Sequence, residues 1–140
     1  MADRNIWTSA TPVIGPGNAR KGHMIGGVFS LVTGDLTLNK TVSLFKAPKG
    51  FTVTNVKAYA TDMDTDGSPA LVFSVGDADT SGRIVSLSTS AQAGGEPTVA
   101  LSTILGYQYT AETEIVFKCT TAAATAAAGT LTIFMSGYFD

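Results

Sequence analysis

The sequence predicts an all-β protein that folds as a two-sheet antiparallel β-sandwich, with a jelly roll as the preferred topology and an extended arm at the N-terminus. Twenty of the 140 residues are threonine and fifteen are glycine, a composition that favours pleated strands and tight turns over long helices. Eight or nine short segments with strand-like patterns follow one another, and no linker divides them. A chain of this length can bury a single core without disulfides or metals. We therefore expect one β-sandwich domain over residues 25–140, preceded by the arm over residues 1–24.

The arm is distinguished by prolines and glycines and by the lack of any regular period. Neither the strand period nor the helix period can be laid over residues 1–24. Its Trp7 is the only tryptophan of the chain, and such a residue either folds back onto the domain or anchors in a partner. The residues that the arm could offer to a partner are apolar or basic: Ile6, Trp7, Val13, Ile14, Arg20 and Lys21.

Core strands are expected where apolar residues alternate between turn residues. The first ends at the turn formed by Thr33, Gly34 and Asp35, and the second stops before the turn that contains Pro48. In the third, the alternation slips by one residue near Asn55, which predicts a β-bulge or a bend there. The strands expected before the C-terminal pair cover residues 25–32, 41–46, 51–61, 69–75, 83–88, 98–105 and 106–110.

Two apolar strands, 113–119 and 129–139, form the expected centre of the fold. In the first, the alternation places Cys119 on the buried face with Ile115 and Phe117, as an unpaired thiol. In the second, both faces carry apolar side chains, which is typical of a strand inside a sandwich or an interface. The Ala/Thr-rich run 122–128 between them is too short for a stable helix, so we expect a loop.

The charge content narrows the possible partners. Charged residues make up 14% of the chain and mean hydropathy is positive, which indicates a surface that another protein partly covers. Seven of nine basic residues but only two of eleven acidic ones lie in residues 1–57, a separation that suits docking between protein surfaces. The basic residues are dispersed, which disfavours nucleic acid as a partner. No apolar run approaches the roughly 18 residues of a membrane span, so no membrane partner is expected.

Two acidic loops, 62–67 and 76–82, are the candidates for a metal site. The first begins like a calcium loop, with Asp62, Asp64 and Asp66 followed by glycine, but Phe73 stands where a bidentate glutamate is needed. The two loops could converge on calcium without flanking helices. The favoured interpretation is that the aspartates cap turns, so no cofactor or metal is expected.

Residue types for catalysis are scarce. His23, the only histidine, lies in the arm, and a site that combines it with Cys119 would require the thiol to be exposed against its strand pattern. Glu112 and Glu114 lie on one strand face, where an exposed polar role is expected. We therefore predict no catalytic residues, no enzymatic activity and no small-molecule substrate.

Several stretches of the chain resemble the small structural proteins of tailed-bacteriophage heads. The stretches are the arm, residues 73–86 and residues 106–139. The residues that carry the resemblance are Gly76, Asp77, Gly82 and Arg83, then Tyr109, Thr110 and Ala111, and finally Gly129, Thr130 and Leu131. The proteins that it resembles are capsid decoration, or cement, proteins with β-sandwich folds.

The resemblance implies a role and partners but no catalytic or ligand-binding residues. A member of that family would be made in the host cytoplasm and would stabilise the exterior of the virion capsid by binding the major capsid protein and sister copies. We expect a homotrimer, because a small sandwich with little charge and a doubly apolar terminal strand has faces to cover. The alternative is a glycan-binding sandwich domain of a head fibre or tail adhesin, with Tyr107, Tyr109 and Tyr138 as aromatic platforms.

Overall fold

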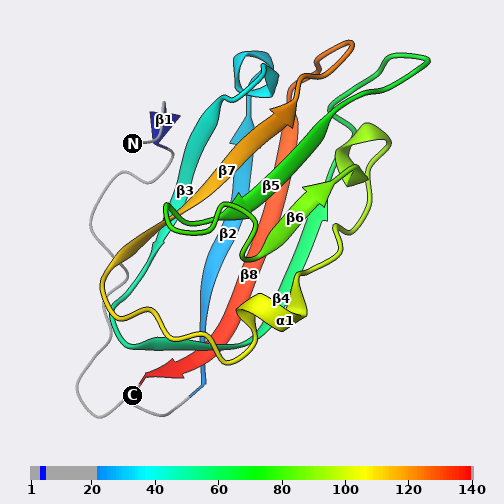
Figure 1. Ribbon diagram of the computed structural model, residues 1–140. Helices are drawn as coiled ribbons and strands as arrows, with labels where there is room; N and C mark the ends of the chain where they lie inside the picture. Colours follow the sequence, from blue (N-terminus) through cyan, green and yellow to red (C-terminus); the bar gives the residue numbers. More distant parts are fainter. Residues whose placement is uncertain (1–3, 6–21, 140) are drawn as a thin grey trace.

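The computed structural model describes residues 4–5 and 22–139, and in these residues eight β-strands form two layers (Figure 1). The strands are β1 (Arg4–Asn5), β2 (His23–Leu31), β3 (Thr41–Ala47), β4 (Phe51–Ala60), β5 (Val72–Gly76), β6 (Val85–Ser88), β7 (Thr113–Thr121) and β8 (Gly129–Phe139). The helices of this part of the chain are single turns: η1 (Thr33–Leu36), η2 (Ser90–Gln92) and α1 (Leu101–Ile104). None of them is long and apolar enough to cross a membrane. The predicted all-β sandwich is confirmed.

The strand order shows how the chain is distributed between the two sheets. The front sheet in Figure 1 has the order β1-β3-β7-β5-β6 and the back sheet the order β2-β8-β4. All pairings are antiparallel except the short parallel pairing of β1 with β3. Strands β2 to β5 alternate between the two sheets, and β7 and β8 then each insert between two earlier strands. This is the order of a jelly roll in which the position beside β4 lacks a continuous strand.

The segment at that position corrects two strand predictions. Residues 98–105 and 106–110 were expected to form strands, but Gly95 and Gln108 each make only an isolated bridge to β4. Between these two points the chain crosses to the front sheet, where Val99 bridges Val85 of β6, and then forms α1. A segment that leaves one sheet edge, pairs with the other sheet and returns cannot keep the ladder of a single strand. Apolar alternation alone could not distinguish this crossing from a strand.

The other predicted strands are present within three residues at each end, and the predicted bulge is confirmed. The register of β4 on β8 shifts between Val53 and Asn55. Gly137 of β8 is the partner of Val53, and a Cβ atom at Gly137 would run into the Thr52 carbonyl oxygen. The bend therefore depends on a glycine in the facing strand.

The core fills the space between the sheets and has two aromatic centres. Phe73 and Phe117 stack within the front sheet at 5.4 Å, and Phe29 and Phe45 stack across the two sheets at the same centroid distance. Cys119 is buried and unpaired as predicted, and its burial raises the pKa of the thiol to about 11. Residues 122–128 form a loop without helix, also as predicted.

The boundary between arm and domain is less sharp than the sequence suggests. β2 begins at His23, two residues inside the expected arm. Arg4 and Asn5, near the start of the arm, extend the edge of the front sheet. Residues 4–5 of the arm thus pair with β3, and residues 23–24 pair with β8.

Candidate interaction surface

The partner-binding residues predicted from the sequence lie outside the described residues: Ile6, Trp7, Val13, Ile14, Arg20 and Lys21. The described part of the arm is held by an ion pair that sequence inspection missed. Arg4 Nε and Nη2 donate to Asp35 Oδ1 and Oδ2 at 3.2 and 2.8 Å, and Nη2 also donates to the Ser30 carbonyl at 3.1 Å. Asp35 is 1% exposed, and its hydrogen bond to Arg4 raises the pKa of that guanidinium. The pair fixes the start of the arm against the edge of the sandwich.

The first acidic loop is centred on a buried carboxylate that accepts hydrogen bonds from two loops. Asp64 is 1% exposed and accepts backbone N–H groups from Ala70 at 2.7 Å and Leu71 at 3.0 Å. Ala124 and Thr125, about sixty residues later in the chain, each donate at 2.9 Å. Burial alone would raise the pKa of Asp64, but the four donors outweigh it and hold the pKa well below its usual value of 3.8. Asp64 therefore joins the β4–β5 loop to the β7–β8 loop.

The neighbouring aspartates make turns of the same kind. Asp62 Oδ1 accepts from the Asp64 N–H and Asp66 Oδ2 accepts from the Ser68 N–H, each two residues further on. Asp66 Oδ1 also accepts from the Thr125 hydroxyl at 2.8 Å. Among the described residues no group of three or more His, Cys, Asp or Glu side chains could hold a metal ion. The aspartates that have the spacing of a calcium loop here accept hydrogen bonds from backbone N–H groups.

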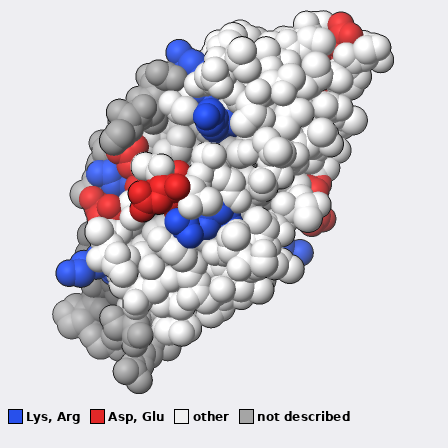
Figure 2. Space-filling model, in the orientation of Figure 1, with Lys and Arg blue, Asp and Glu red and all other residues white. Residues whose placement is uncertain are grey.

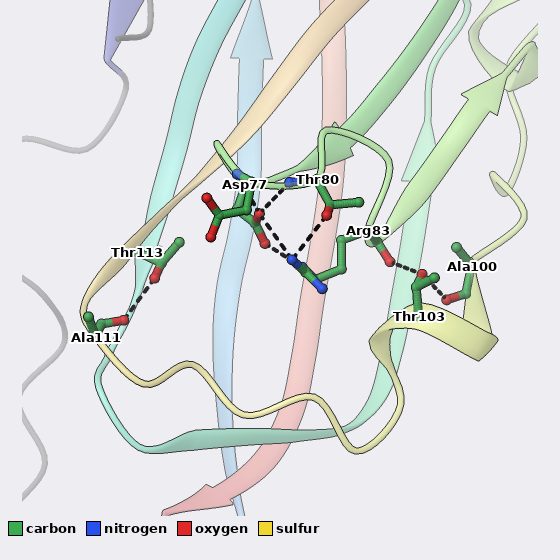
Figure 3. Close-up of polar contacts among 8 residues, drawn as sticks. Asp77, Thr80, Arg83, Ala100, Thr103, Ala111 and Thr113 are labelled. Atoms are coloured by element: carbon green, nitrogen blue, oxygen red, sulfur yellow. Dashed lines mark hydrogen bonds and ion pairs between the residues drawn. The ribbon is translucent and has the colours of Figure 1, made fainter.

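The second acidic loop is closed by an ion pair (Figure 3). Arg83 Nε donates to Asp77 Oδ2 at 2.6 Å, and Nη2 donates to the Thr80 hydroxyl at 3.1 Å. The Thr103 hydroxyl at the end of the crossing segment donates to the Arg83 carbonyl at 2.7 Å. The guanidinium lies 3.9 Å from the centroid of the Tyr107 ring. The loop and the crossing segment are therefore one packed unit.

The three tyrosines considered for glycan binding do not form a shared platform. Tyr109 is 1% exposed, and burial raises its pKa. Tyr107 packs edge-on against Tyr109 and is covered by Arg83. Tyr138 is exposed but belongs to the back sheet. Burial and sheet assignment, which depend on the tertiary fold, separate residues that the sequence grouped by type.

The remaining candidate residues also take separate places. His23 packs its ring edge-on against Phe139 at 5.1 Å. Glu112 pairs with Lys46 at 3.5 Å, whereas Glu114 is half-buried in β7. Cys119 donates its thiol hydrogen to the Thr121 carbonyl. The contacts recorded for these candidates are thus a ring contact, an ion pair and a thiol hydrogen bond.

Two shallow features mark the surface of the sandwich. An open groove of about 450 Å³ runs between β6 and residues 96–98, and hydroxyl groups dominate its lining: Ser86, Ser88, Thr89, Ser90 and Thr98. On the back sheet a hollow of about 170 Å³ is lined by Lys57, Ala58, Tyr59, Glu96, Thr132 and Phe134. On the side shown in Figure 2, the surface over β6 is almost uncharged, and the charged groups gather over the middle and left of the view. Both features are shallow and open, unlike the deep concave pockets that enclose small molecules.

Comparison with known proteins places the fold among capsid chains of phages. No protein-family model matches the chain, and no curated protein matches its sequence. A chain of the capsid asymmetric unit of cyanophage Pam1 is 25% identical, with a TM-score of 0.75 and coverage of 94% of both chains. A chain of the capsid of Ralstonia phage GP4 is 20% identical, with a TM-score of 0.76 over 94% of this chain and 92% of that one.

A more distant similarity points the same way. A chain of the acid-stable capsid of the Helicobacter pylori bacteriophage KHP30 is 13% identical, with a TM-score of 0.57 over 84% of this chain and 93% of that one. The last two similarities concern the fold alone, because their sequence identities are low. The class that the fold defines is therefore a β-sandwich shared with chains of phage capsids.

Proposed function

We propose that this chain is a non-enzymatic structural protein of a bacteriophage virion. The observation that carries the proposal is the similarity to a chain of the Pam1 capsid, which extends over 94% of both chains at 25% identity. Within that class, the particular role that we propose is decoration: the protein binds the major capsid protein and sister copies on the exterior of the shell.

Electron microscopy of virions tests this role. Particles from a phage that encodes the chain should carry one set of densities on the outer surface of the shell, and particles from a deletion strain should lack it. Density that disappears from a tail tip or from the inner surface instead would contradict decoration. Selective binding of the purified protein on a glycan array, without shell binding, would favour the adhesin alternative.

We further propose that the arm contributes to shell attachment through Trp7. Truncation of a tryptophan anchor commonly costs about 2 kcal/mol or more, which is roughly a thirtyfold loss of affinity. Trp7→Ala should therefore weaken binding to shells by about that factor, while the melting temperature of the free protein stays within about 2 °C. Leu38→Ala, an exposed substitution in the η1–β3 loop, is the control and should change neither quantity.

A large fall in melting temperature would contradict the role of Trp7 in shell attachment. A fall of more than about 10 °C in the melting temperature of Trp7→Ala would mean that the side chain packs on its own domain. The docking role would then belong to the loops or to a sheet face.

A further inference from the structure

The outward side of the back sheet is an apolar surface that no other described element covers. We call it the back face and define it by Met24, Gly26 and Val28 of β2, Thr132 and Phe134 of β8, and Lys57 and Tyr59 of β4. The register places these residues in adjacent rows: Gly26, Phe134 and Lys57 in one, and Val28, Thr132 and Tyr59 in the next. In Figure 1 the back sheet lies behind the front sheet, so the back face is turned away from the viewer.

The back face exposes large apolar side chains from two strands. Met24 is 65% exposed, Val28 62% and Tyr59 50%, and Phe134 between them is only half-buried. Monomeric soluble proteins rarely leave apolar groups contiguous over such a surface, whereas interfaces between subunits do. The composition of the back face is therefore that of a subunit interface.

The shape of the back face favours a partner with the same features. Gly26 has φ of +119°, and a Cβ atom there would run into the Ile133 carbonyl oxygen, so the position requires glycine. The strand consequently has a gap between two projecting side chains, Met24 and Val28, with the half-buried Phe134 beside it. Copies that meet around a symmetry axis bring the same projections and the same gap together, so matching features near the axis face one another.

The charges on the back face also favour a second copy as the partner. Lys57 is the only Lys, Arg, Asp or Glu residue among the outward positions of β2, β8 and β4. Glu96 lines the same hollow as Lys57, so one positive and one negative charge share this rim. In a contact between copies each charge meets the same set again, and a balanced set avoids the repulsion that a one-sign patch would cause. The back face has no strong charge of one sign that would complement a strongly charged partner.

We propose that the back face is the surface through which sister copies of this chain bind one another. The inference deepens the proposed decoration role, on which it rests, by assigning the contact between copies to β2, β8 and β4. The front sheet and the arm then remain free for the shell.

Light scattering on the full-length protein tests the assignment. The wild type should show a mass that is a multiple of 14.4 kDa at micromolar concentration, and Val28→Lys should shift it to the monomer with at least a tenfold weaker association. The matched control is Leu87→Lys, because Leu87 is 63% exposed and lies in β6 of the other sheet. The control should keep the wild-type mass. An unchanged mass for Val28→Lys, or loss of association in both variants, would overturn the assignment.

A crosslinking experiment keeps the test decisive if the lysine variant fails to fold. Cys119 is fully buried, so Met24→Cys introduces the accessible thiol, and mild oxidation should give a crosslinked pair on a non-reducing gel. Leu87→Cys should remain uncrosslinked at the same concentration. Equal crosslinking of both variants would overturn the proposal.

Shell binding separates this inference from the proposed function. If the wild type associates and binds shells, and Val28→Lys does both equally well, only the back-face assignment is contradicted. A monomeric wild type whose shell binding is lost in Val28→Lys would make the shell the occupant of the back face. A wild type that neither associates nor binds shells would contradict the proposed function itself.

Discussion

Buried aspartates organise the loops at the level of single residues. In the first acidic loop, side chains two residues apart each accept the backbone N–H two positions later, which produces the same spacing of acids that a calcium loop uses. Asp64 differs from its neighbours because four further donors, two from its own loop and two from the distant β7–β8 loop, saturate its oxygens. A carboxylate in that position contributes to folding rather than to ion binding.

The first prediction concerns Asp64. Asp64→Asn replaces one acceptor oxygen by an NH₂ group that faces backbone donors, so buried N–H groups lose their partner. At pH 7 we expect the melting temperature to fall by about 5 °C or more, measured by circular dichroism. Asp79→Asn, in the exposed turn of the second loop, is the control and should melt like the wild type.

The same substitution should have a defined pH dependence. The pKa of Asp64 is lower in the folded protein than its usual 3.8, so its contribution to stability is fully present above about pH 4 to 5. That contribution is lost as the pH falls through the folded pKa. The difference between the melting curves of wild type and Asp64→Asn should therefore shrink progressively as the pH falls below about 4 towards the folded pKa, and a constant difference between pH 7 and pH 2 would contradict the role of the charge.

At the level of elements, the pairing of β4 with β8 determines the bend of the back sheet. Within residues 22–139, these two strands and β2 form the back sheet with β8 in the middle, so any distortion of β8 reaches both neighbours. The bulge between Val53 and Asn55 brings the Thr52 carbonyl close to the backbone of Gly137. The glycine is thus required by close approach of the facing strand.

The second prediction concerns this approach. Gly137→Ala would place a methyl group against the Thr52 carbonyl and the Phe51 ring, and neither the backbone nor a core aromatic can yield easily. We expect a fall of more than about 10 °C in melting temperature or loss of soluble protein. Gly34→Ala, which meets no atom within 4 Å, is the control. Equal melting of the two variants would show that β4 relaxes at the bulge.

At the level of the whole molecule, the two halves of the chain interleave. Residues 1–57 carry a net charge of +5 and the remainder −7, a separation along the chain that was interpreted as suited to docking between protein surfaces. In the structure β3 of the first half pairs with β7 of the second, and Lys46 forms an ion pair with Glu112. Interdigitation of the halves therefore brings opposite charges together instead of producing two separate patches. Figure 2 shows both signs of charge on the same side of the molecule.

The third prediction is the oligomeric state. With little charge and an uncovered back face, the protein should associate as a homotrimer of about 43 kDa, three times the chain mass of 14.4 kDa. Multi-angle light scattering at micromolar concentration measures this directly. A strictly monomeric mass would contradict self-association, and a dimer would keep an interface between copies but exclude three-fold symmetry.

The sequence by itself determined the fold class, most strand positions, the bulge in β4 and the burial of Cys119. These features follow from a local alternation of apolar and polar residues, which records the two sides of a strand wherever the strand lies. Tertiary structure decided the crossing of residues 98–105, the hydrogen bonds of Asp64 and the ion pair of Arg4 with Asp35. Each depends on groups that are far apart in the chain, such as Asp64 and Thr125, and no local period encodes them. Tertiary structure also decided the exposure of the back face, because an apolar strand face has the same sequence pattern whether it packs against another sheet or is exposed to solvent.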